Sequence, residues 1–199
     1  METTSTKQKF GTRQLVLIGM LSGISIFMGI TGIGFIPLPW MKASIMHVPV
    51  IIGAVLEGPI VGAAVGLVFG LFSIYQNITT PALLSPIFMN PIIAIVPRVL
   101  IGIVSYYVFK FVKNTFHKEK LGLTLAAIAG TATNTIGVLG LTYILALDKF
   151  AALKDISNSA VAYALTAIGT TNGIPEVLVS VLIVVPVVTG LFKIYKRKK

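Results

Sequence analysis

Cysteine is absent from this 199-residue chain, and histidine occurs only twice, at His47 and His117. The lack of cysteine excludes disulfide bonds and thiolate metal sites. The sequence also contains no HExxH or GxSxG motif, so it lacks the usual signatures of zinc and serine hydrolases. We therefore expect no catalytic residue, no metal site and no cofactor site in this chain.

Acidic residues are scarce as well: six, against 16 lysine and arginine residues, for a net charge of +10. We expect no nucleic-acid partner, because the basic residues stand in short clusters between apolar segments. Apolar residues make up 55% of the chain, charged residues 11%, and the mean hydropathy is +0.94. A soluble domain of this length cannot bury so much apolar surface. The sequence therefore predicts one integral-membrane domain over residues 1–199, solvated by the lipid bilayer.

The apolar residues fall into six segments, near residues 14–36, 44–56, 60–76, 91–112, 121–146 and 173–192. About 20 helical residues span a bilayer core, so the second segment is short. The first is too long for the core of a signal peptide, and we interpret it as a retained helix. We predict an all-α membrane protein, with six transmembrane helices in one bundle and both termini on one side.

Basic residues predict the orientation. Twelve of them flank the segments on the side of the termini: Lys7, Lys9, Arg13, Lys110, Lys113, Lys118, Lys120, Lys193, Lys196, Arg197, Lys198 and Lys199. The opposite side has three, Lys42, Lys149 and Lys154. Positive charge favours the cytoplasmic side, so we predict cytoplasmic termini. The external connections, near 37–40, 76–90 and 147–172, are long, which suggests lids over an external site.

Polar side chains gather toward the external ends of the predicted helices. Ionisable and amide groups are costly inside a membrane and indicate function there. We predict a substrate pocket in the outer half of the bundle, formed by Arg98, Asn134, Trp40, Asn77, Asn90, Tyr163 and Asn172. His47, Tyr75, Gln76 and Glu176 lie in the same region.

Structural alternatives remain open for several of these residues. Arg98 and Glu176 could form an internal ion pair, and Asn134 could bridge two helices. The aromatic residues could belong to the interfacial belt. His47 could serve as an ordinary helix-end residue.

Glycines recur at four-residue spacing in the third segment, at Gly58, Gly62, Gly66 and Gly70. This spacing forms a strip on one helix face, where another backbone can approach closely. A shorter pair, Gly19 and Gly23, occurs in the first segment. Such strips serve either packing inside the bundle or contact with a partner protein. We predict that these six glycines form a coupling interface.

The run from His47 to Ser73, HVPVIIGAVLEGPIVGAAVGLVFGLFS, with Asn90-Pro91 and Pro97-Arg98, resembles the S components of energy-coupling factor (ECF) vitamin transporters. The closest subgroup is the pantothenate-specific one, and folate-type components come next. The resemblance implies a bacterial cell-membrane protein that captures a small anionic vitamin outside. It also implies docking on a transmembrane coupling subunit with two cytoplasmic ATPases, and toppling within the membrane. A stand-alone carrier is the alternative from another class.

The chain itself has no GxxxxGK[ST] motif, so we expect ATP to be hydrolysed by partner subunits. In S components, small residues on the first helix typically contact the coupling subunit. Gly19, Ser22 and Gly23 stand here in place of the alanine pair common in the family.

Overall fold

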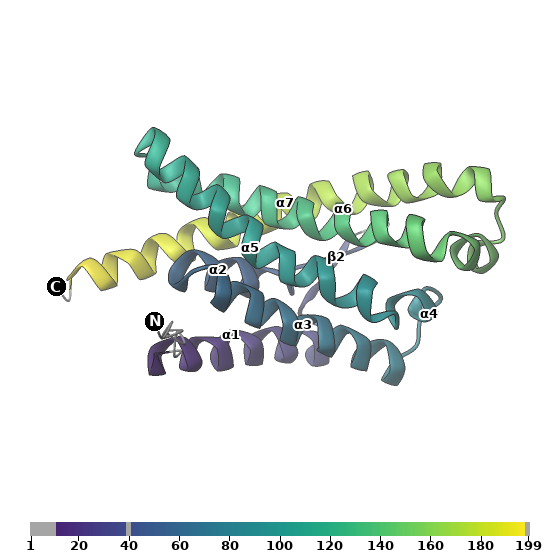
Figure 1. Cartoon of the computed structure of the whole chain (residues 1–199), viewed down its shortest axis with the longest axis horizontal. Coiled ribbons are helices and arrows are strands. Elements are labelled where there is room, and N and C mark those ends of the chain that lie inside the picture. Colours follow the sequence, from purple (N-terminus) through teal and green to yellow (C-terminus); the bar gives the residue numbers. More distant parts are fainter. Residues whose placement is uncertain (1–10, 39–40, 198–199) are drawn as a thin grey trace, which may run out of the picture.

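The computed structural model describes residues 11–38 and 41–197 as a bundle of long helices (Figure 1). In chain order the elements are α1 (Thr12–Thr31), β1 (Phe35–Leu38), β2 (Met41–Ser44), α2 (Val48–Glu57), α3 (Pro59–Thr79), α4 (Ser85–Phe88), α5 (Pro91–Phe116), α6 (Glu119–Lys154) and α7 (Asn158–Arg197). Within the described ranges, five helices are long and apolar enough to cross a membrane, and α2 is a shorter apolar helix. The prediction of a helical membrane protein is confirmed.

The two ends of the bundle differ in what they contain. α1 begins and α7 ends at one end, which also holds the connection between α5 and α6 (Figure 1). We refer to this as the termini end. The opposite end holds α4 and the connection between α6 and α7, and we refer to it as the α4 end (Figure 1).

The first connection is more ordered than a loop. Gly32, with φ +74°, ends α1 earlier than predicted, since a left-handed residue cannot continue the helix. The chain then forms an antiparallel hairpin in which Phe35 pairs with Ser44. The prediction that the first helix continues to residue 36 is therefore wrong. The short hairpin is a local addition to a fold that is otherwise helical, as predicted.

The largest departure from the prediction concerns residues 147–172, which are helical rather than an external loop. α6 continues to Lys154, with a kink at Ala146, and α7 begins at Asn158. Within this stretch, helical hydrogen bonds satisfy the hydroxyl groups of the threonines. Thr166 Oγ1 donates to the carbonyl oxygen of Ala162 at 2.7 Å, and Thr171 Oγ1 donates to that of Ala167 at 2.7 Å. Such bonds within one helix leave no need for an irregular backbone.

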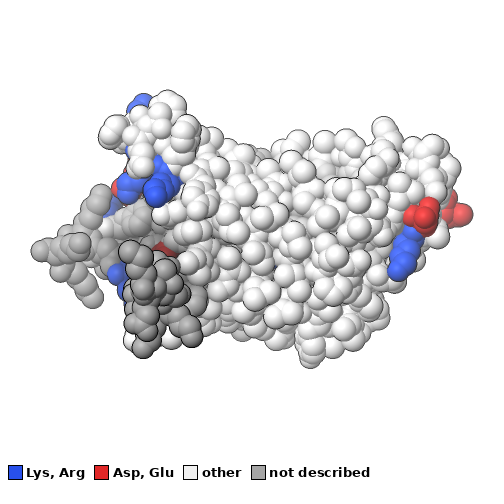
Figure 2. All heavy atoms as spheres, in the orientation of Figure 1, with Lys and Arg blue, Asp and Glu red and all other residues white. Residues whose placement is uncertain are grey.

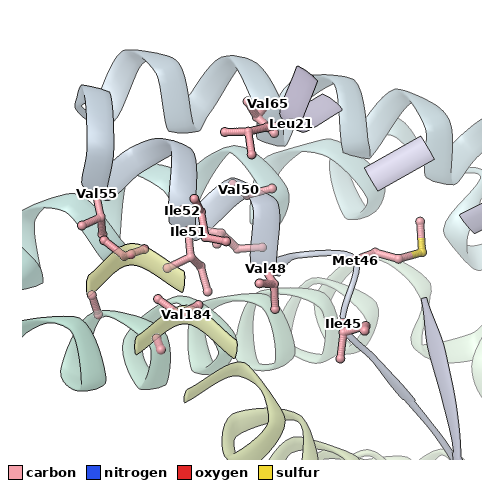
Figure 3. Packing of buried hydrophobic residues seen from close by; sticks show 14 of the residues in the cluster. Leu21, Ile45, Met46, Val48, Val50, Ile51, Ile52, Val55, Val65 and Val184 are labelled. Atoms are coloured by element: carbon pink, nitrogen blue, oxygen red, sulfur yellow. The ribbon is translucent and has the colours of Figure 1, made fainter. Parts of the chain in front are cut away.

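α2 is buried on all sides and fills the termini half of the bundle. Its ten residues rise about 15 Å, roughly half of a bilayer core. Figure 3 shows its valine and isoleucine side chains between Leu21 and Val65 on one side and Val184 on the other. Since α2 is short, the α4 half of the bundle has no central helix.

The glycines of α3 pack against α5 inside the bundle. A Cβ atom at Gly66 would lie 2.2 Å from the Arg98 carbonyl oxygen, and one at Gly62 would lie 2.9 Å from Gly102 Cα. One at Gly70 would lie 2.9 Å from the Ala94 carbonyl oxygen. This corrects the expectation that Gly62, Gly66 and Gly70 face a coupling subunit, because α5 already occupies that side.

The remaining glycines of the predicted interface have different surroundings. Gly58 adopts φ +102° at the break between α2 and α3, so its role is conformational. Gly19 and Gly23 are exposed on α1, and no described atom lies within 4 Å of a Cβ placed there. Gly19 and Gly23 therefore remain open for contact with another protein.

Charged residues lie at the two ends of the bundle. On the face shown in Figure 2, blue and red atoms occur only near those ends, and the broad band between them is uncharged. At the termini end, Arg13 of α1 forms an ion pair with Glu57 of α2. The uncharged band is what a surface in contact with lipid tails requires.

Candidate functional site

A polar cavity lies in the half of the bundle nearer the α4 end, between that end and the start of α2. Its volume is about 400 Å³, within the range of small-molecule sites. The hairpin, α3, α4, α5 and α6 all contribute to its wall. The lining residues are Phe35, Ser44, Met46, Phe69, Ser73, Gln76, Asn77, Thr80, Ala82, Phe88, Arg98 and Asn134.

Among the described residues that line the cavity, Arg98 is the one with a charged side chain. Its side chain is 8% exposed, although it carries a full positive charge. Nη1 donates a hydrogen bond to the Ile93 carbonyl oxygen at 2.8 Å, and the guanidinium carbon lies 5.7 Å from the centre of the Phe69 ring. Nε is buried and has no hydrogen-bond partner among the described residues. The guanidinium group therefore retains donor capacity.

Glu176 does not neutralise Arg98 directly. Its Oε1 accepts a hydrogen bond from the Ser44 backbone N–H at 2.9 Å, which ties the hairpin to α7. Within residues 11–38 and 41–197, no ion pair joins Arg98 to Glu176. The structure thus disfavours the internal ion pair that the sequence left open. A buried cation without a contacting counter-ion is costly, which suits a site that receives an anion.

Asn134 of α6 adds a neutral polar group to the same wall. Its Oδ1 is buried and, in the part of the chain that the structure describes, has no hydrogen-bond partner. An unsatisfied buried acceptor carries a desolvation cost that a ligand donor can relieve. Arg98 and Asn134 therefore offer an incoming molecule a cation and an acceptor.

His47 closes the region next to the start of α2. It is fully buried, and Nε2 lies 2.9 Å from Thr131 Oγ1. Thr131 Oγ1 in turn donates to the Ala127 carbonyl oxygen at 2.9 Å. The threonine therefore accepts from His47, and Nε2 carries the proton. This arrangement supports the interpretation of His47 as a helix-end residue.

Asn77 holds one side of the cavity in shape. Its Nδ2 donates to the Ser73 carbonyl oxygen at 2.8 Å, and its Oδ1 accepts from Ser85 Oγ at 2.7 Å. Ser85 Oγ also accepts from the Ala82 N–H at 2.8 Å. Asn77 thus connects α3 to the segment that leads into α4.

The other predicted site residues lie elsewhere. Asn90 caps α5, its Oδ1 accepting from the Ile92 N–H at 3.0 Å, and does not line the cavity. Tyr163 is 81% exposed on α7, and Asn172 is half-buried on α7 outside the cavity wall. This corrects the assignment of these three residues to the pocket. For Tyr163 and Asn172, that assignment depended on an external loop over 147–172. Trp40 lies outside the described residues.

The sequence interpretation missed several wall residues, most of them apolar. Phe35, Met46, Phe69 and Phe88 line the cavity but resemble ordinary core or lipid-facing residues in the sequence. Ser73 carried a usable signal, because a serine four residues before Asn77 lies on the same helix face.

Two further hollows lie between α6 and α7, with volumes of about 510 and 340 Å³. They share Thr135, Ile136, Gly169 and Thr170, and no charged residue lines either of them. They suit apolar contact better than they suit a charged solute.

The fold and the cavity define a class of protein. A cavity lined by a buried cation, which forms no ion pair with any described residue, occupies one half of a membrane bundle, while the apolar α2 fills the other half. Such a bundle is suited to hold a small molecule, and among the described residues the apolar side chains of α2 close the cavity toward the termini end. It is a membrane-embedded binding subunit of a transport system.

Comparison with known proteins identifies the family. The model for the substrate-specific component of ECF transporters matches residues 13–188. The pantothenic acid transporter PanT of Lactococcus lactis subsp. cremoris (strain MG1363) is 36% identical over 173 residues, covering 79% of this chain and 81% of that protein. The pantothenate transporter PanT of Leuconostoc mesenteroides subsp. mesenteroides is 30% identical over 172 residues, covering 83% and 84%. This chain belongs to the family of ECF transporter substrate-specific components.

Family membership confirms the resemblance seen in the sequence. The family and these relatives are transporter components, which confirms that the chain is not an enzyme. It is a multi-pass membrane protein that works with an energy-coupling module on a small vitamin.

Proposed function

We propose that this substrate-specific component binds pantothenate in the cavity at the α4 end. The observation that supports this most directly is Arg98, a buried cation that lines the cavity and lacks a contacting carboxylate within the described chain. The two relatives described above carry names that specify pantothenate.

The chemistry of pantothenate suits the cavity wall. Its carboxylate would accept charge-assisted hydrogen bonds from Arg98. Its hydroxyl and amide groups would face the polar side chains of Asn134, Ser73 and Gln76, and Asn134 Oδ1 would gain a donor. Its dimethyl group would pack on the apolar part of the wall, near Phe69 and Phe88.

Delivery would require partner subunits. We propose that the loaded protein docks on a transmembrane coupling subunit carrying two cytoplasmic ATPases, and topples to present its cavity to the cytoplasm. Two observations support this: α2 blocks the termini half with apolar side chains, and the sequence has no phosphate-binding loop. The exposed face of α1 around Gly19 and Gly23 is the proposed docking surface.

We also propose that the termini end faces the cytoplasm of the bacterial cell and that the cavity opens outside. The split of twelve basic residues against three supports this orientation. Lys110, Lys113, Lys118 and Lys120 flank the α5–α6 connection, whereas Lys149 and Lys154 accompany Asp148 and Asp155 at the other end.

Cysteine labelling tests this orientation. The natural chain has no cysteine, so Lys118→Cys and Ser157→Cys each introduce a single exposed thiol. In intact cells, an impermeant maleimide should label position 157, and position 118 should react only after the cells are opened. Labelling of position 118 but not position 157 in intact cells would reverse the proposed orientation.

Ligand identification tests the substrate. We expect mass spectrometry of the protein purified in detergent to detect copurifying pantothenate, and calorimetry to show that pantothenate binds and folate does not. Copurification of folate would show that folate, and not pantothenate, is the substrate, and the protein would still be a substrate-specific component. Uptake of pantothenate by vesicles that contain this chain alone, without ATP, would indicate a stand-alone carrier.

A further inference from the structure

The turn of α5 between Ile93 and Arg98 has an unusual hydrogen-bond arrangement. Pro97 lies inside α5, where its ring nitrogen has no hydrogen to donate. The residue four positions earlier is Ile93, so its carbonyl oxygen lacks the usual helical partner. Ile93 is fully buried, and an unsatisfied carbonyl there would carry a free-energy cost.

Arg98 supplies the missing donor. Its Nη1 lies 2.8 Å from the Ile93 carbonyl oxygen. A side chain on a helix leans toward the N-terminus of that helix, and α5 begins at the α4 end. The hydrogen bond therefore holds the guanidinium group about one turn beyond its own Cα, toward the cavity.

Neighbouring helices hold the backbone of this turn from two sides. On α6, a Cβ at Gly137 would lie 3.0 Å from Pro97 Cβ, so α6 packs closely on the proline ring. On α3, Gly66 lies against the Arg98 carbonyl group. With its backbone held in this way, the hydrogen bond to the Ile93 carbonyl oxygen fixes the direction of the Arg98 side chain.

We infer that Pro97 is a positioning residue for substrate selectivity: it leaves the Ile93 carbonyl oxygen for Arg98 and thereby aims the guanidinium group at a ligand carboxylate. This inference rests on the proposed function, because it takes Arg98 as the carboxylate-binding group. It adds that a proline, which makes no charged contact itself, sets the preference for an acid over a neutral analogue.

Pro97→Ala is the test, with pantothenate and pantothenol, its neutral alcohol analogue, as paired ligands in calorimetry. The new N–H would bond the Ile93 carbonyl in the ordinary helical way and compete with Arg98. We expect pantothenate affinity to fall about tenfold, a part of the effect expected for losing a hydrogen bond to a charged group. Pantothenol affinity should not change, and the thermal midpoint of the ligand-free protein should stay the same or rise, because the helix gains a hydrogen bond.

Pro186→Ala is the matched control, since Pro186 also lies inside a long helix, α7, and does not line the cavity. It should leave both affinities unchanged. An equal loss for both ligands in Pro97→Ala, or no loss for either, would overturn the inference. If Pro97→Ala does not fold, Pro97→Val provides the same N–H with more side-chain volume.

The failure of the proposed function gives a different result. If the natural protein does not prefer pantothenate to pantothenol, the carboxylate contact with Arg98 is wrong, and the inference about Pro97 falls with it. If Arg98→Ala abolishes the preference and Pro97→Ala preserves it, Arg98 binds the carboxylate and only the role of Pro97 is refuted.

Discussion

Replacing Arg98 with alanine is expected to weaken pantothenate binding roughly 10- to 150-fold. The range follows from the contribution of a hydrogen bond to a charged group, about 1.5–3 kcal/mol. Arg98 makes no ion pair within the described residues, so the larger effect of its loss should fall on ligand binding. Calorimetry in detergent measures the affinity.

Thermal unfolding of the same preparation separates binding from folding. Removing Arg98 leaves the buried Ile93 carbonyl oxygen without its donor, so the ligand-free protein should lose some stability. Stabilisation by added pantothenate should also decrease, because the ligand binds more weakly. Lys110→Ala is the matched control, since Lys110 is a cation of the same helix that is exposed and lies outside the cavity wall. Unchanged pantothenate affinity in folded Arg98→Ala would contradict the carboxylate contact and leave Arg98 a structural role.

Hydrophobic patterning predicted the helical membrane bundle because long apolar segments have few other stable forms in lipid. The segment near 60–76 is α3 (Pro59–Thr79), and that near 91–112 begins with α5 at Pro91. The same patterning failed over 147–172, where charged residues such as Asp148 and Lys149, and three threonines, interrupt the apolar sequence. The hydroxyl groups of the threonines bond within the helix, a local arrangement that an average over residues does not register.

The position of each polar residue along its predicted helix was enough to assign three of them correctly to one cavity. Arg98, Asn134 and Asn77 lie on α5, α6 and α3, and all three line it. Depth alone does not tell which face of a helix a residue occupies. Tyr163 and Asn172 were misplaced for another reason: the prediction put them in an external loop over 147–172, whereas both lie on α7.

The length of α2 links the fold to the proposed cycle. A short central helix leaves the α4 half of the bundle hollow and fills the termini half with apolar side chains. The first connection then folds back as a hairpin, whose Ser44 reaches both Glu176 and the cavity. The ten-residue length of α2 thus leaves space for the proposed binding site and also places apolar side chains between that site and the termini end. In the proposed cycle, release at the termini end would therefore require movement of the whole bundle or the action of a partner subunit.

Gly66→Ala is expected to lower thermal stability and pantothenate affinity together. The added Cβ would lie 2.2 Å from the carbonyl oxygen of Arg98 and 2.8 Å from its carbonyl carbon, and backbone atoms cannot rotate away as a flexible side chain does. Overpacking of this kind costs about 1–3 kcal/mol, and we expect the upper part of that range. Because α5 must shift at Arg98 itself, the guanidinium group should lose its position in the cavity.

Gly23 on α1 provides the contrasting variant, since no described atom lies within 4 Å of a Cβ at that position. Gly23→Leu should retain the stability and the pantothenate affinity of the isolated subunit. If α1 is the docking surface, this variant should fail to copurify with the coupling subunit and should abolish ATP-driven uptake, since a large side chain would prevent close helix approach. Measuring the thermal midpoint, the affinity and complex formation for both variants separates internal packing from docking. Normal stability of Gly66→Ala would contradict the close contact between α3 and α5, and normal uptake by Gly23→Leu would exclude this part of α1 from the docking surface.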